Sequence, residues 1–168
     1  MEKIGIFYGS STGNGKLIAE LIRKSAGANT SDIFDIAKSR TSDMESYRNL
    51  IFGVSTWWGG EIQDDWKDFM YQFQHLDLNQ KKIALYGLGD QFTYFNNFAD
   101  GLGILHDILT GKKCELIGSW PTEGYVFRKS RAVINGRFVG LVLDEDIQLE
   151  HTKRRIKDWV DSLKKEFY

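Results

Sequence analysis

The 168-residue sequence has one cysteine, one proline and almost no net charge. Cys114 alone cannot form an intramolecular disulfide, so a reducing, cytoplasmic location is expected. A formal net charge of −1 argues against a general nucleic-acid binder, which carries a basic excess. No apolar run approaches the roughly 18 residues that span a membrane. The first residues also lack the charged and apolar regions of a signal peptide.

What the chain does have is an alternation of strand and helix patterns. Short apolar runs, typical of strands buried on both faces, predict strands at 3–8, 32–36, 49–54, 82–86, 114–118 and 138–143. Apolar residues at helical spacing predict helices at 16–26, 62–73, 98–109 and 156–167. Repeated units of this kind predict one α/β domain over residues 1–168 with a doubly wound parallel sheet.

The first predicted strand ends in a loop of small residues that opens a helix, Gly9-Ser-Ser-Thr-Gly-Asn-Gly-Lys16. Hydroxyl groups and accessible backbone N–H groups at a helix N-terminus favour an anion; an ordinary helix cap is the alternative. The nucleoside-triphosphate loop needs a glycine where Ser10 stands and a hydroxyl where Leu17 stands. The dinucleotide fingerprint needs a small residue where Ile18 stands. The loop therefore predicts a phosphate site for a ligand other than ATP or NAD.

Two later strand ends place large aromatic side chains beside glycines, in Ser55-Thr-Trp-Trp-Gly-Gly60 and in Gly87-Leu-Gly-Asp-Gln-Phe-Thr-Tyr94. The carboxyl ends of parallel strands meet at one edge of the sheet, where ligands bind. Loops lie at the surface, and a planar heterocycle stacked between two such rings would bury them. The alternative is that Trp57 or Trp58 folds back onto the sheet edge. Together, the three loops predict a site for a planar ring that carries a phosphate.

These motifs resemble those of the flavodoxins, in their long-chain form, over essentially the whole chain. Residues 10–15 are similar to the family phosphate loop, 56–57 to the inner aromatic loop and 89–94 to the outer one. Residues 60–66 and 138–148 also resemble family signatures, and 120–137 resemble the insertion that splits the last strand. The resemblance implies a sheet of five parallel strands in the order 2-1-3-4-5, the last of them split by this insertion. It also implies a low-potential one-electron carrier with noncovalently bound FMN, an electron-transport flavoprotein and not an enzyme.

The resemblance also assigns contacts with FMN to individual residues. Trp57 is implied to stack on the inner ring face and Tyr94 on the outer face. Asp146 is implied to reach the ribityl chain, with a cap of the last helix as its alternative role. The remaining contacts are implied for the phosphate from Ser10, Ser11, Thr12, Gly13, Asn14 and Gly15, for the inner face from Thr56, Trp58 and Gly59, and for the polar ring edge from Gly89, Asp90 and Asn97. The family usually has threonine where Gly15 stands, so one hydrogen bond to the phosphate is lost or is replaced by one from Ser11.

The implied partners are redox proteins, of the NADPH–flavodoxin or ferredoxin reductase type or the 2-oxoacid oxidoreductase type. The chain is expected to be a monomer that binds neither nucleic acid nor membrane. Acidic residues gather around the predicted site while the last helix is rich in lysine and arginine, so we expect an acidic rim that steers basic partners. An FMN-dependent reductase or quinone oxidoreductase on the same fold is the alternative function, although the sequence offers no candidate hydride-donor site. No spacing of Cys, His and carboxylates predicts a metal site.

Overall fold

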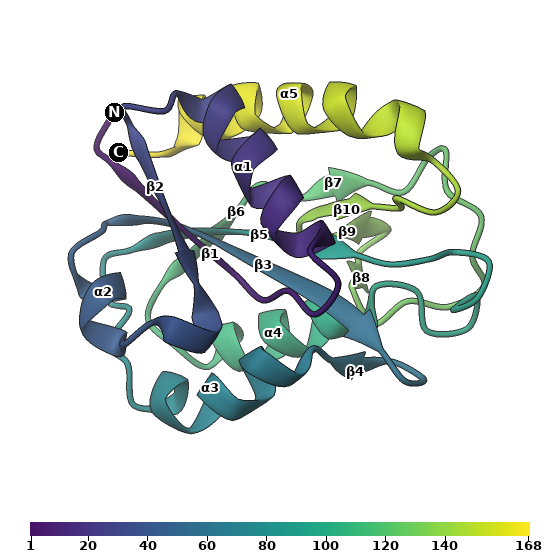
Figure 1. Ribbon diagram of the computed structural model, residues 1–168, viewed down its shortest axis with the longest axis horizontal. Helices are drawn as coiled ribbons and strands as arrows, with labels where there is room; N and C mark the ends of the chain where they lie inside the picture. Colours follow the sequence, from purple (N-terminus) through teal and green to yellow (C-terminus); the bar gives the residue numbers. More distant parts are fainter.

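The centre of the computed structural model, which describes residues 1–168, is a parallel sheet in the order β2-β1-β3-β5 (Figure 1). Its strands are β1 (Ile4–Tyr8), β2 (Ser31–Asp35), β3 (Asn49–Trp57) and β5 (Lys82–Leu88). Two short strands border β5: β6 (Glu115–Ile117) pairs with its first half and β10 (Leu141–Leu143) with its second half. With β6 and β10 as the two halves of a fifth strand, the doubly wound order 2-1-3-4-5 is confirmed.

Helices cover both faces of this sheet, which explains why its strands read as continuous apolar runs. On one face lie α1 (Asn14–Ala26) and α5 (Leu149–Glu166). On the other lie α2 (Thr41–Glu45), α3 (Asp64–Gln74) and α4 (Asp100–Thr110), together with a short 3₁₀ turn at Ile36–Lys38. No helix has the length and apolar character needed to cross a membrane. The five-residue α2 was missed because it is too short to show a helical period.

Strand β3 runs three residues further than predicted. Its last residues leave the parallel sheet and pair in antiparallel fashion with β4 (Glu61–Ile62), which the sequence did not predict. In the turn of this hairpin, the backbone N–H of Gly60 donates to the carbonyl of Trp57 at 3.0 Å. The hairpin therefore carries Trp57 beyond the edge of the sheet.

The insertion between β6 and β10 forms a second, antiparallel sheet in the order β7-β9-β8: β7 (Trp120–Pro121), β9 (Arg137–Phe138) and β8 (Val133–Ile134). The single strand predicted over 138–143 is wrong in this respect, since Phe138 belongs to the small sheet and Leu141 to the main one. Between them the chain crosses close to β5: a Cβ on Gly140 would lie 2.1 Å from the carbonyl oxygen of Leu85.

The insertion also supports the loop that follows β5. The backbone N–H of Arg128 donates to the carbonyl of Phe95 at 2.8 Å, and that of Phe98 donates to the carbonyl of Lys129 at 3.2 Å. Phe98 is buried and packs against the rings of Tyr125, Phe127 and Phe138 from the insertion. The outer aromatic loop is thus held from behind by an aromatic cluster.

Candidate functional site

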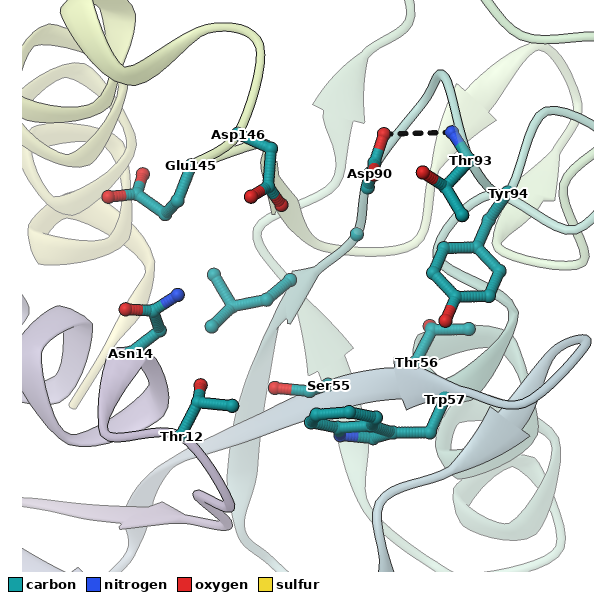
Figure 2. A pocket seen from close by; sticks show the side chains of 12 residues that line it. Thr12, Asn14, Ser55, Thr56, Trp57, Asp90, Thr93, Tyr94, Glu145 and Asp146 are labelled. Atoms are coloured by element: carbon teal, nitrogen blue, oxygen red, sulfur yellow. Dashed lines mark hydrogen bonds between the residues drawn. The ribbon is translucent and has the colours of Figure 1, made fainter.

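A cleft of about 350 Å³ opens at the carboxyl ends of the parallel strands (Figure 2). Eight of the residues expected to bind a cofactor line it: Thr12, Asn14, Thr56, Trp57, Gly89, Asp90, Tyr94 and Asp146. They come from the phosphate loop, the β3–β4 hairpin, the loop after β5 and the segment after β10. The topology therefore brings together segments that the sequence had indicated separately.

The phosphate loop presents backbone N–H groups at the positive end of α1. Gly13 precedes the helix with a φ of 95° and no side chain caps the helix; the hydroxyl of Ser10 instead accepts from the N–H of Gly13 at 3.0 Å. No acceptor in the chain takes the backbone N–H groups of Ser11, Thr12, Asn14, Gly15 or Lys16. An ordinary side-chain cap is therefore not what this loop forms. Unpaired N–H groups and the helix dipole fit an oxyanion.

Gly15 is buried where the loop packs back against the end of β1. A Cβ at this position would lie 2.3 Å from the carbonyl oxygen of Gly9 and 3.1 Å from the Cβ of Ser10. Beneath the loop, the buried hydroxyl of Tyr86 donates to the carbonyl of Gly15 at 3.3 Å. Gly15 thus allows the start of α1 to pack closely against the backbone at Gly9. This packing role does not depend on whether the residue carries a hydroxyl group for the phosphate.

Two aromatic side chains stand at one end of the cleft, Trp57 from β3 and Tyr94 from the loop after β5 (Figure 2). Both are partly exposed. Next to Trp57, the buried hydroxyl of Thr56 accepts from the backbone N–H of Gly101 at 3.0 Å, which ties the end of β3 to α4. Trp58 is 73% exposed. Neither tryptophan folds back onto the sheet edge, because one lines the cleft and the other projects into solvent.

The hairpin turn holds three consecutive residues at positive φ: Trp58 at 39°, Gly59 at 64° and Gly60 at 107°. Positive φ is unfavourable for a residue with a Cβ, so Trp58 is the strained member. Asn97 packs against this turn, since a Cβ on Gly60 would lie 3.2 Å from the Cβ of Asn97. Asn97 joins the outer loop to the inner hairpin and does not line the cleft, and neither do Trp58 and Gly59.

Three carboxylates stand along the other edge of the cleft, Asp90, Glu145 and Asp146 (Figure 2). Burial raises the pKa of Asp146, and repulsion from Asp90 and Asp144 raises it further. Burial likewise raises the pKa of Glu145, against a hydrogen bond from Thr152. For Asp90, hydrogen bonds from Thr93 and Phe92 outweigh the effect of burial and lower the pKa. The edge thus resists further negative charge.

The segment after β10 is fixed by Asp144, which is fully buried. Its carboxylate accepts from the backbone N–H groups of Gln91 at 3.0 Å, Asp146 at 3.1 Å and Ile147 at 3.0 Å. It therefore links the outer loop to the segment that carries Asp146. Helix α5 begins only at Leu149, so Asp146 lies in the cleft and does not cap that helix.

Four further lining residues were not assigned to the site from sequence: Ser55, Leu88, Thr93 and Glu145. Ser55 and Leu88 lie in β3 and β5, which extend beyond their predicted ends. Correct strand ends would have placed both residues at the edge of the sheet where the cleft opens. Thr93 is brought to the cleft by Asp90, because the carboxylate of Asp90 accepts from the backbone N–H of Thr93 at 2.9 Å in a tight turn. The other phosphate-loop residues, Ser10, Ser11, Gly13 and Gly15, lie beside the cleft but do not line it.

The family model described as flavodoxin matches residues 6–159. The chain is 48% identical over 165 residues to a flavodoxin of Synechocystis sp., covering 98% of this chain and 97% of that protein. The chain belongs to the flavodoxin family. Flavodoxin 1 of Escherichia coli K12 is 43% identical over 165 residues, which cover 98% of this chain and 94% of the relative.

Among solved structures, Fusobacterium nucleatum flavodoxin bound to flavin mononucleotide superposes on this flavodoxin fold with a TM-score of 0.95 and 32% sequence identity. The match covers all of both chains. A flavodoxin of Pseudomonas aeruginosa, at 15% identity and a TM-score of 0.67, shares the fold. The resemblance seen in the phosphate and aromatic loops is therefore confirmed at the level of the family.

Proposed function

We propose that this flavodoxin binds FMN noncovalently and carries single electrons at low potential between redox proteins, with residues 1–168 acting as one domain. The observation that carries the proposal is the meeting of an anion-binding loop and two aromatic side chains in one cleft. The family match supports it, as does the flavin mononucleotide bound to the Fusobacterium nucleatum flavodoxin. Bound FMN would supply the reversible uptake and release of one electron at a time.

The residues of the chain fit the three parts of this cofactor. The phosphate would lie on the free backbone N–H groups of Ser11, Thr12, Asn14 and Gly15, in a loop segment, Ser10–Gly15, that includes no cation. Neutral donors suit a permanently bound phosphate monoester, whereas phosphoryl transfer needs cationic or metal stabilisation. Trp57 and Tyr94 would bury the ring faces and exclude water. Gly89 and Asp90 would meet the polar edge of the ring, and Asp146 would lie near the ribityl chain.

The acidic edge of the cleft supports the proposal of a low potential. Electron uptake adds negative charge within a partly buried site that already holds the carboxylates of Asp90, Glu145 and Asp146. Burial and nearby like charges both disfavour an anion. We therefore expect these side chains to oppose full reduction and to keep the carrier strongly reducing.

Partners would dock at the rim of the cleft. Among the partly or fully exposed carboxylates that follow the strand ends, Asp90, Glu145 and Asp146 line the cleft, and we propose that Glu61, Asp64, Asp65, Asp68 and Asp100 extend the acidic rim around it. Two exposed aromatic side chains stand among them, Trp58 at 73% and Phe92 at 82%. A basic partner surface with an apolar centre would match this rim and would be steered to it by charge. Reductases of the NADPH–flavodoxin or ferredoxin type and 2-oxoacid oxidoreductases are the proposed classes.

The remaining charge lies elsewhere on the molecule. Most basic residues of α5 are exposed on a helix that covers the same face of the sheet as α1, along the upper edge of Figure 1, so we propose that they take no part in partner docking. We also propose that the carrier is a cytoplasmic monomer. An FMN-dependent reductase on the same fold is not favoured, because the relatives across nearly the full length are named as flavodoxins.

An absorption spectrum recorded during stepwise dithionite reduction tests the function. A carrier that accepts electrons singly will show a distinct blue, one-electron-reduced species before it bleaches. Direct bleaching without that species would refute the proposal. Oxidation of NAD(P)H by the protein alone would favour the reductase instead.

A further inference from the structure

A buried glutamine, Gln63, joins the phosphate loop to the inner aromatic hairpin. It follows β4 and precedes α3, and it is 1% exposed. Its backbone N–H donates to the carbonyl of Ser55 at 3.1 Å, which anchors it to β3. Its side chain passes beneath the end of β1, where Gly9 leaves room: a Cβ on Gly9 would lie 2.0 Å from the Oε1 of Gln63.

The neighbours of Gln63 fix the orientation of its amide group. The carboxylate of Asp65, which can only accept, lies 2.7 Å from Nε2. On the other side, Oε1 accepts from the backbone N–H of Trp66 at 3.4 Å. The amide therefore cannot turn over without placing Oε1 against a carboxylate and Nε2 against an N–H group. One hydrogen of Nε2 is left, and it points to the hydroxyl oxygen of Ser11 at 3.1 Å.

This contact determines what Ser11 can do. A serine hydroxyl has one proton to donate and two lone pairs. Because Nε2 has no lone pair to offer, Ser11 must accept from it, and no group of the chain takes the proton of Ser11. Ser11 is exposed in the loop that carries the unpaired backbone N–H groups. Its proton is thus available to an anion bound at that loop.

We propose that Gln63 is a positioning residue that makes Ser11 a dedicated hydrogen-bond donor to the phosphate of the bound flavin nucleotide. The inference rests on the proposed function, since it assigns the phosphate to this loop. Asp65 orients Gln63, Gln63 orients Ser11, and Ser11 donates to the phosphate. The same glutamine is bonded to β3, so the phosphate end and the ring end of the cleft are held at a fixed separation.

A double-mutant cycle on the full chain, freed of flavin, tests the relay. Gln63→Glu keeps the length and the acceptor for Trp66, and the one proton that it can bind is shared with the adjacent carboxylate of Asp65. It therefore has nothing to donate to Ser11, and the hydroxyl of Ser11 turns to donate to the new carboxyl group. Ser11→Ala removes the hydroxyl. Dissociation constants for FMN and for riboflavin, which lacks the phosphate, are measured for each single variant, for the double variant and for the unaltered chain.

In the unaltered background, Ser11→Ala should weaken FMN binding about tenfold to hundredfold, the range for a hydrogen bond to a charged group. In the Gln63→Glu background the same substitution should change FMN binding less than about twofold, and riboflavin affinity should stay constant throughout. The cycle separates this coupling from the direct repulsion between the introduced carboxylate and the phosphate. An equal effect of Ser11→Ala in both backgrounds would overturn the relay.

Gln63→Met provides a second, uncharged test in case Gln63→Glu fails to fold, as reported by loss of riboflavin binding. Methionine fixes no direction for the hydroxyl of Ser11. FMN binding should therefore weaken severalfold, less than with Ser11→Ala, while riboflavin binding is unchanged. No change in FMN binding would contradict the relay. If the unaltered chain bound riboflavin as tightly as FMN, the phosphate site of the proposed function would itself be refuted.

Discussion

Gly15 offers a sharp test of how the phosphate loop is built. A methyl group at this position would lie 2.3 Å from the carbonyl oxygen of Gly9, about 1 Å inside the 3.4–4 Å of ordinary contact. The obstacle is backbone, which cannot rotate away as a side chain would. Overpacking of this kind costs about 1–3 kcal/mol, so we expect Gly15→Ala to lower the free energy of unfolding of the flavin-free chain by that amount in urea titrations.

Gly15→Thr separates the methyl group from the hydroxyl. Both variants carry the Cβ, and only threonine adds a donor for the phosphate. Since the displaced loop also moves the N–H groups of Thr12 and Asn14, we expect both to bind FMN more weakly than the unaltered chain, with threonine the less affected. Riboflavin affinity serves as the control and should hardly change. Tighter FMN binding by Gly15→Thr than by the unaltered chain would refute the packing role of Gly15.

Three further predictions concern the rim of the cleft. Trp58→Gly should raise the free energy of unfolding by up to about 1 kcal/mol, because relief of the positive φ at 39° exceeds the entropy cost of glycine; Trp58→Ala, which keeps the strain, should give no gain in urea titrations. Tyr94→Ala should weaken FMN and riboflavin equally, by about tenfold or more, through lost stacking and burial; a loss confined to FMN in fluorescence titrations would contradict a ring contact. Asp146→Asn should stabilise the flavin-free chain by a few tenths of a kcal/mol at pH 7. The pKa of Asp146 in the folded chain is raised above its ordinary 3.8, so the folded chain binds this proton more readily than the unfolded chain. The unaltered chain therefore regains the lost stability as the pH falls toward about 4. A difference in the free energy of unfolding between Asp146→Asn and the unaltered chain that stays constant from pH 7 to pH 4 would contradict this prediction.

The strands and the three loops of the cleft could be predicted because each depends on local signals, whereas the strand order came from the family resemblance. The strands read as apolar runs, and the ligand loops follow them directly. The ends of the strands were harder to predict, because β3 continues to Trp57 only through its pairing with β4. The segment after Phe138 was misassigned because an apolar run with a central glycine reads as one strand. The close passage of Gly140 over Leu85, which divides it, is visible only in three dimensions.

The contacts that orient the site residues could not be predicted from the sequence, because they join segments that are far apart in the chain. Gln63 and Ser11 are separated by 52 positions, and Gln91 and Asp144 by 53. No pattern in either segment indicates its partner, since the pairing depends on the register of β1, β3 and β10. Sequence could therefore name Ser11 as a donor, but not what directs its proton.

The near-zero net charge, which at first only argued against a nucleic-acid binder, is the sum of two separate surfaces. The carboxylates Asp90, Glu145 and Asp146 stand at the cleft, whereas the lysines near the end of α5 lie on another face. Over distances beyond roughly 10 Å, physiological salt screens each surface from the other. A partner that approaches the cleft would therefore meet the local acidic field rather than the average, which is why association should slow as salt is raised even though the whole chain is nearly neutral.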